Sequence, residues 1–89
     1  NIRADTYVMG IYNIDDQNGI SFPTISESLV KRRMASISTE IIGLATADKL
    51  STVSNQIIGP TNLLTYLVTE NINPNIVKLY TKQKIAVIQ

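Results

Sequence analysis

The chain of 89 residues contains no cysteine and no histidine. Without cysteine no disulfide can hold the fold together, and without either residue the thiolate and imidazole ligands of most zinc and transition-metal sites are missing. The usual general base near neutral pH is missing too, because histidine is the side chain that titrates there. We therefore expect no catalytic residues, no cofactor and no metal, in a protein that is not an enzyme.

Charge is also scarce. Charged residues make up 17% of the chain, against about 25% in an average globular protein. The formal net charge is +1, so no bulk field steers the protein toward nucleic acid or an anionic membrane. The polar surface is built from serine, threonine, asparagine and glutamine instead, and such a surface tolerates contact with a second copy or another protein.

Long apolar runs are absent as well. No segment approaches the ~20 apolar residues that cross a bilayer, so we expect no membrane span. The length fits one small domain over residues 1–89. Because the first residue is Asn1, this domain is a processed chain, a trimmed form or a fragment of a longer protein.

The first structural signal in the sequence is an apolar segment near the N-terminus. Residues 6–14 predict a strand, because β-branched and aromatic residues dominate and apolar side chains occupy both alternating sets of positions. A strand of this pattern is covered on both faces, by helices on one side and by something else, such as a second subunit, on the other. We place a candidate protein interface on this strand, at Tyr7, Met9, Ile11 and Tyr12.

The acidic and amide residues 15–18 lead to Gly19. The dipeptide Asn18-Gly19 favours the positive φ angles of a tight turn, which would pair residues 6–14 with residues 20–22. A calcium loop of the EF-hand type would instead require oxygen ligands at its first and twelfth positions. With Gly19 aligned on the invariant glycine, those positions hold Ile14 and Ile25. We interpret the segment as a turn.

A helix is expected to begin near residue 25, because Thr24 and Glu27 have the spacing of a capping box. Apolar residues then follow at spacings of three and four as far as residue 44, with a break expected near residues 43–48. The same spacing predicts a second helix over residues 48–58. A short third helix is expected within residues 61–71, although the threonine, tyrosine and valine residues there also suit a strand.

The last part of the chain predicts two strands, residues 76–80 and 84–88. The predicted fold is therefore an α+β domain with an N-terminal β-hairpin, two or three central helices and a C-terminal β-hairpin. Its four strands form one mainly antiparallel sheet with the helices on one face.

Two groups of basic residues are candidates for phosphate or nucleic-acid contact. The first is Lys31, Arg32 and Arg33, which fan across ~200° of a helix, so they also fit a solvated helix whose long side chains shield an apolar edge. The second group lies on the predicted C-terminal hairpin, with Tyr80 between its members: Lys78, Lys82 and Lys84. Lysines on an edge strand also prevent aggregation between sheets, which is the commoner role.

These observations lead to three functional hypotheses. The first is a non-enzymatic structural or protein-interaction module that forms a homo-oligomer or joins a larger assembly. The alternative is a small nucleic-acid-associated regulator that uses the cluster Lys31, Arg32 and Arg33. The third is a sensor of a small ligand or a cation.

Overall fold

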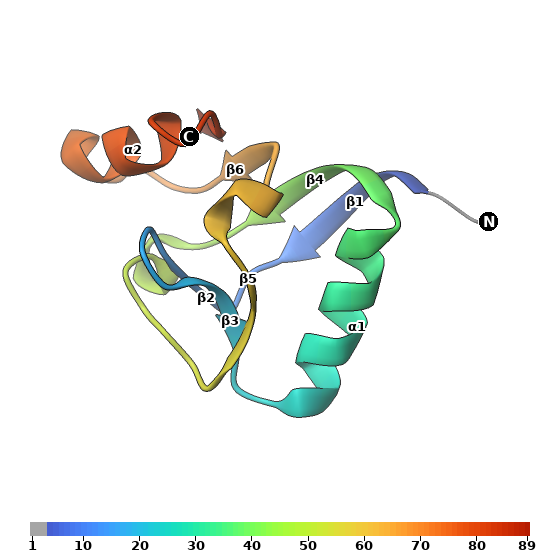
Figure 1. Cartoon of the computed structure of the whole chain (residues 1–89). Coiled ribbons are helices and arrows are strands. Elements are labelled where there is room, and N and C mark those ends of the chain that lie inside the picture. The colour runs from blue at the N-terminus through green and yellow to red at the C-terminus, as the bar shows by residue number, and fades with distance from the viewer. Residues whose placement is uncertain (1–3) are drawn as a thin grey trace.

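The computed structural model describes residues 4–89, which form two sheets joined by one hydrophobic core (Figure 1). Sheet A is parallel throughout, in the order β1 (Ala4–Gly10), β4 (Ser38–Leu44), β6 (Tyr66–Val68) and β7 (Ala86–Ile88). Sheet B is antiparallel, in the order β2 (Asn13–Asp15), β3 (Gly19–Phe22) and β5 (Gln56–Gly59). The helices are α1 (Ile25–Ser36) and α2 (Pro74–Thr81), with two 3-10 turns, η1 (Ala47–Lys49) and η2 (Thr61–Leu63).

The predicted single, mainly antiparallel sheet is therefore wrong. The chain is a small α+β domain, but its antiparallel pairing is confined to sheet B. The error arises in residues 37–44, whose apolar spacing fits a helix stripe and a buried parallel strand equally well. In the structure α1 ends at Ser36, and residues 38–44 form β4 between β1 and β6.

The later elements were also misassigned by local pattern. Instead of a helix, residues 48–58 contain the end of η1, a loop and the start of β5, and residues 61–71 contain η2 and β6. Residues 76–80, predicted as a strand, lie in α2. This helix begins with Pro74 at its first position, and the Asn73 side chain accepts a hydrogen bond from the Asn75 N–H. Proline and asparagine at these positions are a helix-start signal.

The predicted start of the helix at Thr24 is confirmed. The Thr24 hydroxyl oxygen accepts a hydrogen bond from the Glu27 N–H at the start of α1, and the same hydroxyl donates to the Glu27 carboxylate. The predicted turn is present between β2 and β3, but only Gly19, with a φ of 89°, and not Asn18 has a positive φ. Residues 13–15 pair with β3, whereas residues 6–10, which were expected in the same hairpin, pair in parallel with β4. A Cβ at Gly19 would lie 2.2 Å from the Gly59 carbonyl oxygen, so glycine is required there.

One face of sheet A meets sheet B and forms the core. Its central residues are Met9 on β1, Ile41 on β4 and Leu67 on β6, all buried. Tyr80 from α2 and Ile85 complete this side of the core, and both are buried. The parallel order of the strands places their carboxyl ends along one edge of the sheet.

The opposite face of sheet A, called the open face below, is apolar, and within residues 4–89 no layer covers its exposed side chains. The register aligns Val8 with Ile42 and Tyr66, and then Leu44 with Val68 and Ile88 in the next row. Val8, Leu44 and Ile88 are 54%, 43% and 48% exposed. Parallel sheets are normally covered on both faces, so this face lacks the layer that such strands usually carry. No helix within residues 4–89 has the length and hydropathy to span a membrane.

Candidate functional site

A cleft of about 330 Å³ lies at the carboxyl ends of β1 and β4, the two adjacent parallel strands of sheet A. In open parallel sheets, ligands bind in crevices outside the carboxyl ends of the strands. The cleft draws its lining from both sheets, α1 and η1: Gly10, Ile11, Tyr12, Phe22, Glu27, Leu44, Thr46 and Lys49. Its volume is that of a site for a small molecule.

The apolar part of the cleft is contributed by the strand ends. Phe22 and Ile11 are buried at its base, whereas Tyr12 and Leu44 are partly exposed at its sides. Gly10 leaves space, because no heavy atom lies within 4 Å of the position that a Cβ would take there. A ligand can therefore approach the backbone of β1 at this residue.

Lys49 supplies the positive charge of the cleft. Its Nζ lies 4.3 Å from the centre of the Tyr12 ring, a cation–π contact, and 3.8 Å from the Asp48 carboxylate. A hydrogen bond from the Thr46 side chain lowers the pKa of Asp48, so this carboxylate is charged at neutral pH. The Lys49 side chain remains 31% exposed, which leaves the ammonium accessible to a ligand.

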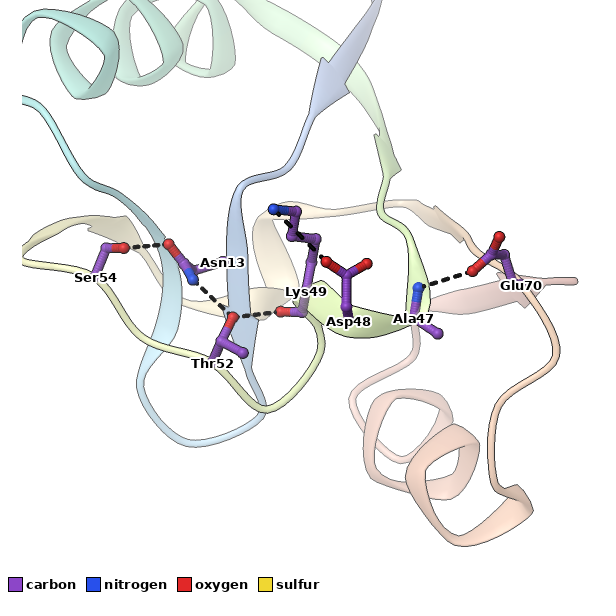
Figure 2. Close-up of polar contacts among 7 residues, drawn as sticks. All are labelled: Asn13, Ala47, Asp48, Lys49, Thr52, Ser54 and Glu70. Atoms are coloured by element: carbon purple, nitrogen blue, oxygen red, sulfur yellow. Dashed lines mark hydrogen bonds and ion pairs between the residues drawn. The ribbon is translucent and has the colours of Figure 1, made fainter.

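A polar network holds the loop that carries Lys49 (Figure 2). Asn13 on β2 donates to the Thr52 hydroxyl at 2.7 Å and accepts a hydrogen bond from the Ser54 hydroxyl. The Thr52 hydroxyl in turn donates to the Lys49 carbonyl oxygen at 2.6 Å. Asn13 is 9% exposed, and a buried, satisfied amide of this kind fixes the conformation of the backbone around it.

The other side of the same loop is tied to the chain after β6. The Ala47 N–H donates to the Glu70 carboxylate at 3.2 Å (Figure 2), and Leu50 is buried beside Ile14, with which it forms a β-bridge. Lys49 is therefore carried by a segment with contacts on both sides. Such preorganisation reduces the entropy that binding would cost.

The polar rim of the cleft contains an acceptor as well as a donor. Glu27 in the first turn of α1 has one carboxylate oxygen 3.2 Å from the Thr24 hydroxyl, and its side chain is exposed. Thr46, just beyond β4, lines the cleft too. These groups can hydrogen-bond ligand hydroxyls, whereas Lys49 can pair with an anion. Within residues 4–89, no three or more acidic side chains come together as a metal site would need.

The first predicted basic group is spread over its helix. The Lys31 Nζ lies 5.5 Å from the centre of the Phe22 ring, and the Arg32 guanidinium donates to the Ile57 carbonyl oxygen at 2.8 Å. Arg33 is exposed in the last turn of α1. Two of the three head groups therefore already have partners within the chain.

The second basic group lies elsewhere. Lys78 is on α2, Lys82 caps its C-terminus, and Lys84 follows with a φ of 65°. Figure 1 shows α2 and α1 at opposite ends of the molecule. The two basic groups do not form one continuous surface, and the nucleic-acid hypothesis gains no support from the described residues.

The four candidate interface residues predicted on the first strand differ in how far they are exposed. Met9 and Ile11 are buried in the core, and Tyr7 is partly buried. Partial burial raises the pKa of the Tyr7 hydroxyl. Tyr12 is 46% exposed and lines the cleft. Only Tyr12 and part of Tyr7 remain accessible to a partner.

The Asp15 side chain stabilises the acidic turn, residues 15–18. The Asp15 carboxylate accepts hydrogen bonds from the N–H groups of Gln17 and Asn18 and from the Asn18 amide. Partial burial acts to raise the pKa of Asp15, but these donors outweigh it and lower the pKa. The Asp16 carbonyl oxygen accepts from the Gln83 amide at 3.2 Å, so the turn contacts the chain beyond α2.

Sequence reasoning did not identify Lys49, Glu27 or Asn13 as members of one site. Their positions in the chain give no motif, because the site exists only once β1 and β4 lie side by side. The usable signal was a polar segment, residues 46–49, directly after an apolar strand, but residues 38–44 were assigned to a helix. Comparison of the sequence with models of protein families and with curated proteins gives no match.

Proposed function

We propose that this chain is a non-enzymatic binding module whose cleft takes a small organic anion that carries hydroxyl groups. One observation carries the proposal: the ammonium of Lys49 lies in a cleft at the carboxyl ends of two adjacent parallel strands. That edge is the usual ligand site of open parallel sheets. A carboxylate or phosphate of the ligand would pair with Lys49 in place of the exposed Asp48 carboxylate, which lies 3.8 Å from the ammonium.

The remaining lining supports this ligand class. Tyr12 and Leu44 offer apolar contact to the carbon skeleton, while Glu27 and Thr46 can accept or share hydrogen bonds with hydroxyl groups. Glu27 would repel the charged end of the ligand, so that end is directed toward Lys49. The site therefore favours a molecule with an anionic end and a hydroxylated end.

The experiment is a titration of the ¹⁵N-labelled protein with phosphorylated and carboxylated polyols, and with inorganic phosphate alone, followed by NMR. We expect shifts at residues 10–12 and 46–49 with at least one organic anion. Lys49→Gln should weaken its binding about tenfold or more, because a hydrogen bond to a charged group contributes about 1.5–3 kcal/mol.

Two variants control this experiment. Lys78→Gln removes an exposed lysine of α2 without touching the cleft and should leave binding unchanged. Gly10→Val fills the free space at β1 and should block the ligand while the fold persists. If no organic anion of the panel binds below millimolar concentration, or if Lys49→Gln binds as well as the original chain, the proposed site is incorrect.

A second candidate function is the structural or protein-interaction module that the composition suggests. The observation that favours it is the open face of sheet A, with Val8, Leu44 and Ile88 exposed along parallel strands. A protein of this surface is expected to associate, either with itself or with another protein. Sedimentation equilibrium tests self-association directly, and a strict monomer at high micromolar concentration would leave only a different protein as the partner.

A further inference from the structure

The outer edge of β1 has free backbone hydrogen-bonding groups. The Ile11 N–H donates to the Leu44 carbonyl oxygen at 2.9 Å, and the β1–β4 register continues without a break from there back to Thr6. In a parallel strand the N–H and C=O groups of alternate residues point to the same side. Those of Tyr7 and Met9 therefore point toward β4, and those of Thr6, Val8 and Gly10 point away from it.

No other element satisfies these outward groups within the described chain: Thr6, Val8 and Gly10 have no backbone hydrogen bond beyond the sheet in residues 4–89. Proteins usually protect an edge by shortening the strand or by placing lysine, proline or a bulge on it. The other edge strand of sheet A, β7, has only three residues. In contrast, β1 has seven residues and contains neither a basic residue nor a proline.

We propose that the edge of β1 is occupied by a second copy of this chain, which pairs its own β1 antiparallel with this one about a two-fold axis. An isologous contact needs a surface that is complementary to itself. With Tyr7 on the axis, Thr6 of each copy lies opposite Val8 of the other, and both residues have outward N–H and C=O groups. The two sheets then form one continuous sheet of eight strands.

The charges of β1 are compatible with this register. Asp5 lies opposite Met9 of the other copy, so no like charges of β1 meet across the contact. A pair of seven-residue strands buries less than the ~800 Å² per partner of a standard interface, so we expect a weak dimer that forms at high protein concentration. This inference concerns self-association, one form of the second candidate function, through the edge of β1 rather than through the open face, and it does not depend on the cleft.

Amide hydrogen exchange tests the paired strand directly. In NMR spectra recorded at about 10 μM and 1 mM, the amides of Tyr7 and Met9 should be protected at both concentrations, because they bond to β4. The amides of Thr6 and Val8 should become protected only at the higher concentration, where sedimentation equilibrium should show a dimer. The comparison of neighbouring residues in one strand provides the internal control.

Variants then test the contact without disturbing the sheet. Val8→Pro removes one outward N–H, which an edge strand tolerates, and should weaken the dimer about tenfold or more because two interchain hydrogen bonds are lost per dimer. Val8→Thr keeps that N–H and should leave the dimer unchanged. Val53→Lys, at an exposed position in a loop, should also leave the dimer unchanged.

Each possible result supports or contradicts a stated part of the proposal. If Val8→Pro fails to fold, as circular dichroism would show, the concentration dependence of the Thr6 and Val8 amide protection in the original chain decides the question. A monomer at 1 mM overturns self-association altogether. A dimer in which the Thr6 and Val8 amides still exchange freely overturns the β1 contact but leaves self-association through another surface. Because Gly10 lines the cleft and also belongs to β1, binding in the cleft is tested separately, by the Lys49→Gln titration at a low protein concentration where the chain is monomeric.

Discussion

The two faces of sheet A carry similar side chains but differ in what covers them. On the inner face, Met9 and Leu67 are fully buried against sheet B and the C-terminal part of the chain. On the open face, Val8 on β1 and Leu44 on β4 are about half exposed. Apolar character alone therefore does not show which face of a parallel strand is part of the domain's own core.

The comparison explains why the first strand has apolar residues at both alternating positions. Met9 lies in the core and Tyr7 packs against it, whereas Val8 lies on the face that nothing in residues 4–89 covers. The cleft opens where the two faces meet, since Gly10 and Leu44 belong to the open face and Ile11 to the core. A partner layer on the open face would therefore also border the cleft.

The largest expected difference between the faces comes from truncating one residue on each. Leu67→Ala should lower the free energy of unfolding by about 2–5 kcal/mol, since it leaves a cavity in the buried centre of β6. Val8→Ala on the open face should lower it by less than about 1 kcal/mol. Urea unfolding at low micromolar concentration measures both, and similar m values would show that the unfolded states are comparable.

Equal losses from these two substitutions would contradict the assignment of the inner face as the core. A large loss at Val8 alone would indicate that the open face is covered in solution. Leu67→Met serves as the matched control, because it nearly conserves volume and should cost less than about 1.5 kcal/mol.

The inner side also contains a buried titratable group. Burial, together with the smaller effect of the nearby carboxylates of Asp16 and Asp15, raises the pKa of Tyr80 to about 12. In the unfolded chain tyrosine has a pKa near 10. The folded state therefore holds its proton more firmly, so stability is fully present below pH 10 and falls as the pH rises from about 10 to 12.

Over that interval the loss should reach about 2–3 kcal/mol at most, since one pKa unit corresponds to 1.36 kcal/mol. Tyr80→Phe should remove this part of the pH dependence and change stability little at pH 7. Thermal unfolding of both proteins between pH 8 and pH 12 provides the measurement. Parallel curves for the two proteins would mean that the Tyr80 hydroxyl is not desolvated as described.

The sequence allowed prediction of those features that depend on near neighbours. The Thr24 cap and the turn at Gly19 are fixed by hydrogen bonds and φ angles within a few residues. Strand β4 and the cleft are not determined by near neighbours. The apolar spacing of residues 41–44 also suits a helix, and the strand forms because β1 and β6 pair with it on either side. Parallel pairing of β1 and β4 joins residues 34 positions apart, which no local pattern encodes.

The same limit applies to the site. Lys49 is placed by Asn13 and Thr52, which lie 36 residues before it and three after it in the chain. A lysine after an alanine and an aspartate is unremarkable in a sequence. It acquires a role only because the end of β4 brings it beside Tyr12 at the end of β1.

The smallest expected effect, with opposite signs on the two faces, comes from adding one methyl group to each of two glycines. At Gly43 a Cβ would lie 2.5 Å from the Ile11 Cδ1 and 3.0 Å from both Leu64 methyl groups. Gly43→Ala should therefore lower the free energy of unfolding by about 1–2 kcal/mol through overpacking. At Gly10 a Cβ would contact nothing within 4 Å.

Gly10→Ala should accordingly raise the free energy of unfolding by about 0.5–1 kcal/mol, because alanine loses less backbone entropy on folding. Urea unfolding of the two variants and of Gly43→Ala combined with Ile11→Val provides the measurement. Since valine lacks the Cδ1 atom, the double variant should lose less stability than the sum of its parts. If both glycine variants are destabilised alike, the space beside Gly10 is filled in solution, and the open face is covered there.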